Sequence, residues 1–271
     1  GCSFNDVRIN HLMYADDLIL LSKTKEGIQT QINKLDEYCK KWKLNINLSK
    51  TKIMVFIRGN KLIKTNFEVG STKLVDVKKM KYLGFTISSN NCKFQHTLDD
   101  LSIKAKRVIY ALNMKIKLSR YPIKLSLKLF DTLIKPILLY GAEVWRLSPY
   151  GDYDYNVWDR SKIEMIHVQF LKRILGCNQN TSNIMTRAEL GLRPLLVDIN
   201  EKVLRYIKSI TSRPNSTVYS ALVFEKANTI IPNFYKFLDE FDITLDEATL
   251  NKDKKSTSSL FRNHYDRHWK L

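Results

Sequence analysis

Hydrophobic and polar residues alternate near the start of the chain and then recur with helical spacing. Residues 7–21 predict two short strands that meet at Asp16 and Asp17. The return strand, residues 18–21, is uniformly apolar, which predicts burial on both faces, as in the centre of a sheet. Residues 26–42 predict a helix, because apolar side chains recur at helical spacing. The residues of this apolar seam are Ile28, Ile32, Leu35, Cys39 and Trp42.

Two further apolar segments, residues 53–57 and 81–87, have the β-branched and aromatic composition of strands. The predicted order is therefore hairpin, helix, strand and strand. The simplest architecture for this order is a sheet with a helix packed on one face, so the sequence predicts an α+β fold.

Helical periodicity dominates the middle of the chain. Residues 101–116 predict an amphipathic helix, residues 121–123 break the pattern, and residues 125–140 predict a second helix that is interrupted near Pro136. The buried arc of the first of these helices is expected to contain Leu101, Ala105, Val108, Ile109, Leu112 and Ile116.

The rest of the chain predicts helices separated by polar segments. Residues 148–155 are rich in turn-forming residues and locally acidic, which makes them the best candidate for a domain boundary. Residues 162–175 and 195–210 predict helices. Residues 242–259 predict a polar linker, and residues 261–271 form an aromatic, basic end that either touches nucleic acid or caps a surface.

The charge of the chain favours an anionic partner. The 271 residues carry a net charge of +18, and residues 1–150 hold 27 basic and 12 acidic residues, against 18 and 15 in the remainder. A concentrated positive field favours a polyanion, and nucleic acid is the commonest one. The alternatives are a basic surface that serves solubility and one that faces acidic lipid.

Cysteine usage and hydropathy narrow the class of protein further. The four cysteines (Cys2, Cys39, Cys92 and Cys177) form no CxxC pair, which predicts a reducing, intracellular environment without a disulfide partner. His264 and His268 lack metal-binding neighbours at suitable spacing and are interpreted as surface residues. No apolar stretch approaches the ~20 residues of a membrane span, so no membrane association is expected. The chain starts with Gly1 and not with Met, directly in strand-like sequence, which suggests a piece of a longer polypeptide.

The two adjacent aspartates have two interpretations. They could be an ordinary polar turn, or they could hold metal ions, because hard oxygen ligands on a rigid bend suit Mg²⁺. In nucleotidyl transfer, two such ions about 3.5–4 Å apart stabilise the attacking and leaving oxygens.

Five segments together resemble the reverse transcriptases of non-LTR (LINE-type) retrotransposons, in that family's order. They are residues 14–17 (YADD), 47–51 (NLSKT), 81–84 (KYLG), 128–145 (KLFDTLIKPILLYGAEVW) and 174–191 (ILG through AELG). The resemblance reaches about residue 210. It implies the C-terminal part of an RNA-directed DNA polymerase, a nucleotidyltransferase of a transposable element.

The resemblance implies a partial polymerase palm, a helical thumb and an accessory region. The expected regions are residues 1–95 (second half of the palm), 96–147 (thumb helices), 156–240 (accessory helices) and 241–271 (polar linker and basic aromatic tail). The family's habits also imply a nuclear location.

Roles for individual residues follow from the same resemblance. Asp16 and Asp17 would be catalytic ligands of Mg²⁺, with Tyr14 and Ala15 near the primer end. Lys50 would assist the leaving pyrophosphate of a dNTP, and Tyr82, Leu83 and Gly84 would form the primer grip. The thumb would hold the backbone of the RNA template and DNA primer through its basic residues. These are Lys104, Lys106, Arg107, Lys115, Lys117 and Arg120, which could instead be the solvated edges of an amphipathic helix.

The chain departs from the family pattern in one respect. The family takes another aspartate from a strand far upstream, together with its fingers, and no such sequence precedes residue 14 here. Asp76, Asp99 and Asp100 follow no matching strand pattern. The chain alone is therefore expected not to synthesise DNA, although its parent protein does. The rival hypotheses are a non-catalytic nucleic-acid-binding module and the product of a decayed element.

Overall fold

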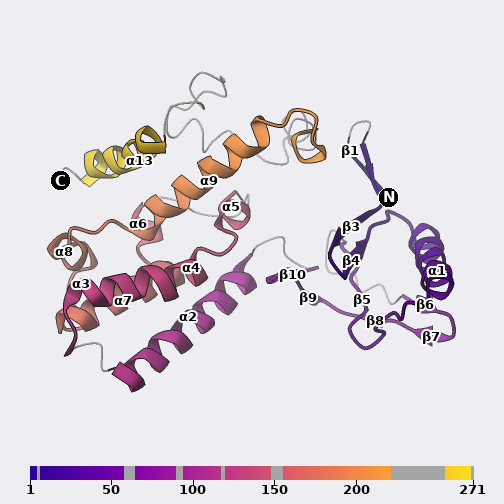
Figure 1. Ribbon diagram of the computed structural model, residues 1–271, viewed down its shortest axis with the longest axis horizontal. Coiled ribbons are helices and arrows are strands. Elements are labelled where there is room, and N and C mark those ends of the chain that lie inside the picture. Colours follow the sequence, from indigo (N-terminus) through magenta and orange to yellow (C-terminus); the bar gives the residue numbers. More distant parts are fainter. Residues whose placement is uncertain are drawn as a thin grey trace. The chain divides into compact units, whose positions relative to one another are not determined.

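A computed structural model describes residues 1–4, 7–57, 65–89, 94–116, 120–147, 155–220 and 254–269 (Figure 1). The chain divides into two compact units. The first comprises residues 1–92 and 213–229, and the second comprises residues 93–212 and 230–271. Among the described residues, the first unit combines short strands with one long helix, whereas the second unit is helical, in agreement with the predicted α+β class.

The strands of the first unit form two-stranded sheets. Four pairs are antiparallel: β1 (Cys2–Phe4) with β2 (Val7–Ile9), β3 (His11–Tyr14) with β4 (Asp17–Leu20), β6 (Glu68–Val69) with β7 (Thr72–Lys73), and β9 (Lys79–Tyr82) with β10 (Phe85–Ser88). One pair, β5 (Lys52–Ile53) with β8 (Val75–Asp76), is parallel.

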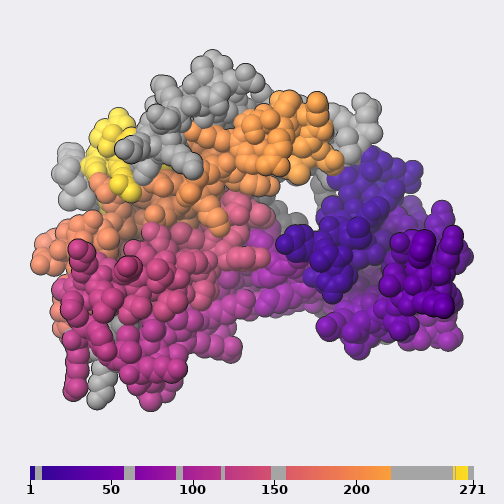
Figure 2. Space-filling model, in the orientation of Figure 1, coloured from indigo at the N-terminus to yellow at the C-terminus, as the bar shows by residue number. Residues whose placement is uncertain are grey.

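Helix α1 (Lys25–Lys41) supplies one wall of the core of the first unit. Its start is capped by Thr24, whose hydroxyl oxygen accepts a hydrogen bond of 3.0 Å from the Gly27 N–H. Ile32 of α1 packs with the buried side chains of Phe67, Val69 and Leu74. Helix α1 is visible at the surface of this unit (Figure 2).

The predicted helix and hairpin are confirmed, but three details of the strand predictions are wrong. The return strand β4 is not buried on both faces: Asp17 is exposed, and Leu18, Ile19 and Leu20 are half-buried. The reason is that β3 and β4, within the described residues, pair only with each other, and α1 packs on β4.

The other two strand corrections concern residues 53–57 and 81–87, and one residue of the predicted helix seam also differs. The strand predicted over residues 53–57 is limited to Lys52–Ile53, and the strand predicted over residues 81–87 is the hairpin β9–β10. Its chain reverses at Leu83 and Gly84, whose φ angles are +46° and +84°. Trp42, placed on the buried seam of the predicted helix, is 61% exposed because it caps the end of α1 and lies beyond the packed face.

The second unit is built around two long helices that carry much of its apolar core. Helices α7 (Lys162–Leu175) and α9 (Leu195–Thr211) confirm the helices predicted over residues 162–175 and 195–210. The other described helices are α2 (Gln95–Ile116), α3 (Ile123–Leu129), α4 (Lys135–Leu138), α5 (Ala142–Trp145), α6 (Tyr155–Trp158), α8 (Asn183–Glu189) and α13 (Lys254–Trp269). The predicted buried arc of α2 is confirmed for Leu101, Ala105 and Ile109, which are buried. The other predicted arc residues, Val108, Leu112 and Ile116, are half-buried.

The interruption predicted near Pro136 is a π-helical segment, Phe130–Ile134, between α3 and α4. Proline lacks an N–H and its ring crowds the preceding turn of a helix. The wider π-turn accommodates this, because the Lys135 N–H bonds to the carbonyl of Phe130, five residues earlier. The helix therefore continues through Pro136 without a break.

The C-terminal helix α13 packs on α9. Phe261 and Tyr265 are buried, and Arg193 forms two hydrogen bonds of 2.9 and 2.6 Å with the Asp266 carboxylate. The described part of the aromatic end thus caps a surface. The linker predicted over residues 242–259 is wrong for residues 254–259, which are helical, and its other residues lie outside the described ranges.

The domain boundary at residues 148–155 falls almost entirely outside the described residues, so the division into palm, thumb, accessory region and tail stays a prediction. No described helix combines the length and the apolar character that crossing a membrane requires.

Candidate metal-binding and nucleic-acid interface

The β3–β4 hairpin presents Asp16 and Asp17 at its tip. Tyr14 pairs directly with Asp17, so the loop contains only Ala15 and Asp16. Two-residue hairpin loops favour primed turns, which need a positive φ at the first loop residue, and Ala15 has φ +53°. Asp16 therefore lies in the loop, Asp17 begins the return strand, and both side chains are exposed.

The two carboxylates supply the hard oxygen atoms that Mg²⁺ prefers. Both groups are exposed and belong to neighbouring residues at the same hairpin bend. Groups of three or more His, Cys, Asp or Glu side chains suited to a metal do not occur among the described residues. Mg²⁺ often takes only one or two carboxylates and keeps several waters, so this donor set fits an open magnesium site.

Asn47 organises the turn that presents Lys50. The Asn47 side-chain oxygen accepts hydrogen bonds from the Ser49 hydroxyl (2.7 Å) and the Lys50 N–H (3.2 Å). The Asn47 carbonyl accepts from the Thr51 N–H and from the Thr51 hydroxyl, both at 2.9 Å. Leu48 anchors the turn on the apolar core, while the Lys50 side chain is exposed. The spacing of Asn, Lys and Thr in this segment is therefore explained by hydrogen bonds that close the turn on Asn47.

The predicted primer-grip residues lie at the tip of the second hairpin. Tyr82 pairs with Phe85, so Leu83 and Gly84 form another two-residue loop. Both loop residues have positive φ, and all three grip residues are half-buried. This turn was not predicted from the sequence, because leucine is not a turn-forming residue.

The predicted basic surface lies on α2 in the second unit. Lys104, Lys106, Arg107 and Lys115 are exposed on this helix, and Arg120 is exposed after it. Lys117 lies outside the described residues.

The same helix exposes an apolar line that the sequence analysis did not identify. Ile103, Tyr110 and Met114 are 50%, 67% and 67% exposed. Their separations of seven and four residues place them on one face of the helix, opposite the buried Leu101 and Ala105. The exposed face of α2 thus combines cationic side chains with an apolar line.

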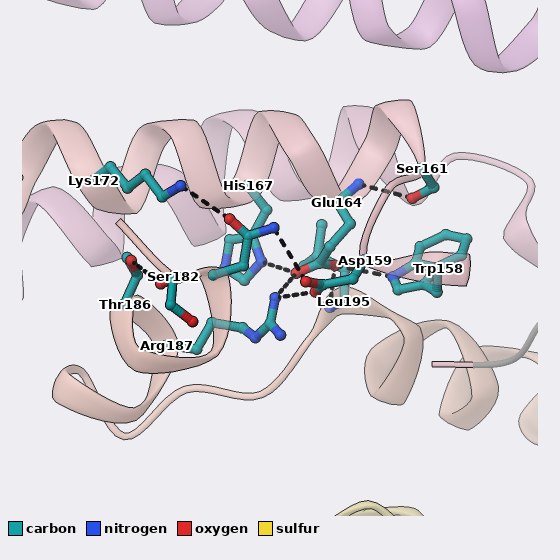
Figure 3. A network of polar contacts seen from close by, with 11 residues as sticks. Trp158, Asp159, Ser161, Glu164, His167, Lys172, Ser182, Thr186, Arg187 and Leu195 are labelled. Atoms are coloured by element: carbon teal, nitrogen blue, oxygen red, sulfur yellow. Dashed lines mark hydrogen bonds and ion pairs between the residues drawn. The ribbon is translucent and has the colours of Figure 1, made fainter. Parts of the chain in front are cut away.

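A buried polar network centred on Glu164 organises the second unit (Figure 3). The Glu164 side chain is fully buried and accepts hydrogen bonds from Trp158 Nε1 (3.0 Å) and the Leu195 N–H (2.8 Å). Its other oxygen lies 3.1 Å from both Arg187 Nη1 and His167 Nδ1. The segments joined are the end of α6, α7, α8 and the start of α9.

Charge complementarity keeps this carboxylate ionised. Burial raises the pKa of Glu164, but the His167 imidazole, the Arg187 guanidinium and the Leu195 N–H together hold it below its ordinary value. Arg187 is also paired with Asp159 at 2.7 Å. The network is interpreted as structural. Its one sequence signal is a glutamate on the apolar face of a predicted helix.

Comparison with known families gives a match within the first unit. Residues 2–87 match the family model described as reverse transcriptase (RNA-dependent DNA polymerase). This segment contains the β3–β4 hairpin, the Lys50 turn and nearly all of the β9–β10 hairpin. The chain is thus similar to a reverse transcriptase over the part that carries the predicted catalytic residues.

Curated relatives come from transposons. The chain is 25% identical over 179 residues to an uncharacterized transposon-derived protein of Caenorhabditis elegans, with 64% of this chain and 58% of that protein covered. It is 22% identical over 203 residues to a probable RNA-directed DNA polymerase from transposon BS of Drosophila melanogaster. A similar polymerase from the X-element of the same fly is 22% identical over 202 residues.

These relatives are longer than the chain. The matches to the two Drosophila polymerases cover 71% of this chain and 21% of each polymerase. The comparison with solved structures gave no match. The similarity to transposon reverse transcriptases therefore rests on sequence.

Proposed function

We propose that this chain is the C-terminal palm half and thumb of a non-LTR retrotransposon reverse transcriptase. The observation that carries the proposal is the exposed pair Asp16 and Asp17 at the tip of a two-residue hairpin, within the segment that matches the reverse transcriptase family. The parent reaction is RNA-templated addition of a dNTP to a DNA primer.

Each part of the chain has one task in this proposal. Asp16 and Asp17 hold Mg²⁺, which when bound stabilises charge on the attacking and leaving oxygens. Lys50, exposed on its turn, neutralises the triphosphate. The β9–β10 tip, with Leu83 and Gly84, supports the primer backbone. The α2 face holds the RNA–DNA duplex through its phosphates, which positions the duplex without reading its sequence.

The proposal assigns binding, and not nucleotide addition, to the chain by itself. The resemblance implies that a complete polymerase takes a further aspartate from a separate strand, and we assign no residue of this chain to that role. Two carboxylates on one hairpin bind a cation less firmly than a full ligand set. A duplex-binding module without catalysis is the second candidate, and the exposed basic and apolar face of α2 favours it.

A binding and extension experiment tests the proposal on the 271-residue chain. Affinity for a labelled RNA–DNA hybrid is measured by fluorescence anisotropy across a salt series, and primer extension is followed with dNTPs and Mg²⁺. We expect binding that weakens with salt, with a log–log slope of roughly −0.7 to −0.9 per phosphate contacted. We expect no extension. Templated extension would show that the chain is a sufficient polymerase, and binding that is independent of salt would contradict the duplex surface.

The metal site is tested separately by titration with Mn²⁺, followed by electron paramagnetic resonance. Asp16→Asn and Asp17→Asn are each expected to weaken Mn²⁺ binding at least several-fold and to leave hybrid affinity unchanged. Glu26→Gln, which removes another exposed carboxylate of the first unit, is the matched control and is expected to have no effect. Equal Mn²⁺ binding in all of the variants would remove the hairpin from the metal site.

A further inference from the structure

Two aromatic side chains stand exposed at the C-terminal end of α1. Tyr38 is 55% exposed and Trp42 is 61% exposed. Their ring centroids lie 6.2 Å apart with the planes inclined by 47°. Both residues lie away from the core that Ile32 forms with Phe67, so their ring surfaces face solvent to a large degree.

Lys43, which follows Trp42 directly in the chain, has a strained backbone conformation at this end of α1. The Leu44 N–H bonds to the Cys39 carbonyl (2.8 Å) and the Lys43 N–H bonds to the Lys40 carbonyl (3.3 Å). This is the Schellman arrangement, in which a residue with left-handed backbone, usually glycine, follows the helix. Lys43 occupies that position with φ +55°.

Strained positions of this kind tend to coincide with functional sites. Among the described residues, the non-glycine residues with positive φ are Ala15, Leu83 and Lys43. Ala15 and Leu83 lie at the tips of the two hairpins that carry the polymerase-like motifs. Lys43 is the remaining one, and the proposed function does not explain it.

The charges around the aromatic pair are predominantly positive. Lys34 lies four residues before Tyr38 and Lys41 three residues after it, so both share the exposed face of the helix. Glu37 is the acidic residue adjacent to Tyr38 in the sequence. Lys40 is directed elsewhere, since its ammonium group bonds Asp36 at 2.6 Å.

We propose that Tyr38, Trp42, Lys41 and Lys43, the α1 aromatic patch, bind single-stranded nucleic acid. Unpaired bases stack on exposed aromatic rings, and lysines beside the rings contact the phosphates. A duplex does not suit this patch, because its bases are already stacked on one another. The contact is therefore distinct from the duplex surface on α2, and it does not depend on the proposed polymerase function.

The test compares variants of the full chain in binding to a fluorescein-labelled oligothymidine. The double variant Tyr38→Ala/Trp42→Ala is expected to bind roughly 5- to 150-fold more weakly, the range for the loss of one stacked base. Phe56→Ala, which removes an aromatic side chain of the first unit that is 59% exposed, is the matched control and is expected to bind normally.

The variant Lys43→Gly distinguishes an effect on nucleic-acid affinity from an effect on the stability of the fold. Glycine adopts the left-handed backbone without strain, so this variant is expected to unfold at a higher urea concentration than the wild-type chain. Its affinity for the oligothymidine should nevertheless fall, and the log–log salt slope should shrink by about 0.7, the loss of one single-strand phosphate contact. Lys73→Gln, another exposed lysine of the same unit, should leave the slope unchanged.

Three outcomes would overturn the proposal. The first is unchanged single-strand affinity in the double variant, and the second is an equal loss in Phe56→Ala. The third is self-association of the wild-type chain in sedimentation that the double variant abolishes without altering single-strand affinity, which would make the patch an interface with a second copy. Affinity for the RNA–DNA hybrid should be unchanged in all patch variants, so a failure of the duplex proposal is recognised separately.

Discussion

Arg187 Nη1 lies 3.1 Å from Glu164 Oε1 in the interior of the second unit, where the two side chains are 2% and 0% exposed. The same guanidinium nitrogen is 2.7 Å from Asp159 Oδ1. Two carboxylates thus share one cation between α7 and α8. The second Glu164 oxygen accepts from the first N–H of α9, at Leu195. The buried Glu164 side chain therefore fixes the positions of α8 and α9 relative to α7.

Removal of this carboxylate should strongly destabilise the second unit. Glu164→Ala leaves Trp158 Nε1 and the Leu195 N–H without their acceptor in the interior, and it removes one carboxylate from Arg187, which keeps its pairing with Asp159. Breaking a buried pair on one side costs roughly 3–5 kcal/mol. The free energy of unfolding, measured by urea denaturation with circular dichroism, checks this value. Lys162→Gln is the control, because its ion pair with Asp99 has side chains that are 60% and 32% exposed. The control should lose less than about 1 kcal/mol.

The same carboxylate should make stability depend on acid pH. The folded-state pKa of Glu164 lies below its ordinary value of 4.5, so the unfolded chain takes up the proton first as the pH falls. Its contribution is fully present above pH 4.5 and is lost as the pH falls through the folded pKa. Glu164→Gln cannot titrate, so the stability difference between wild type and this variant should shrink below pH 4.5. A difference that stays constant from neutral to acid pH would contradict the assignment.

Helices of the second unit were the most predictable part of the fold. The predicted bounds of α7 agree with the structure and those of α9 differ by one residue, because each helix buries an apolar face whose spacing is visible in the sequence. The Glu164 network was not predictable, since its partners Arg187 and Leu195 lie 23 and 31 residues away in the chain. Sequence patterns report local periodicity, and a buried ion pair depends on packing between distant segments.

Strand predictions succeeded where the turn carried a recognisable signal. Asp16 and Asp17 interrupt an apolar segment, and the structure places a hairpin tip there. Residues 81–87 contain Leu83 before Gly84, and a leucine with φ +46° gives no sign of a turn, so two strands were predicted as one. The prediction that β4 is buried on both faces was also wrong. Apolar composition shows that a strand can be buried, but it does not show which neighbouring strands pack against it.

The tip of the β9–β10 hairpin allows a direct test of backbone strain. Gly84→Ala places a Cβ on a residue with φ +84° and should destabilise the hairpin by about 1–2 kcal/mol, the cost of left-handed backbone for an L-residue. Leu83→Gly should be close to neutral, because relief of strain at φ +46° is offset by the added flexibility of the unfolded chain and by the loss of a half-buried side chain, a loss that does not arise at the exposed Lys43. Amide hydrogen exchange of residues 79–88 measures both effects. Equal loss of protection in the two variants would show that side-chain packing, and not backbone strain, dominates at this tip.

Variants of residues on the exposed face of α2 can separate apolar from electrostatic contributions to duplex binding. The double variant Tyr110→Ala/Met114→Ala should weaken binding to an RNA–DNA hybrid roughly 30-fold, if each side chain buries about 40 Å² of apolar surface and so contributes about 1 kcal/mol. The log–log salt slope should stay unchanged, because that slope counts neutralised phosphates. Lys106→Gln and Arg107→Gln should each lower the slope by about 0.9. Met185→Ala, which removes an apolar side chain with 66% exposure on α8, should change neither affinity nor slope. If the double variant matches wild type while the charge variants weaken binding, the apolar line lies outside the interface and the duplex is held by phosphate contacts alone.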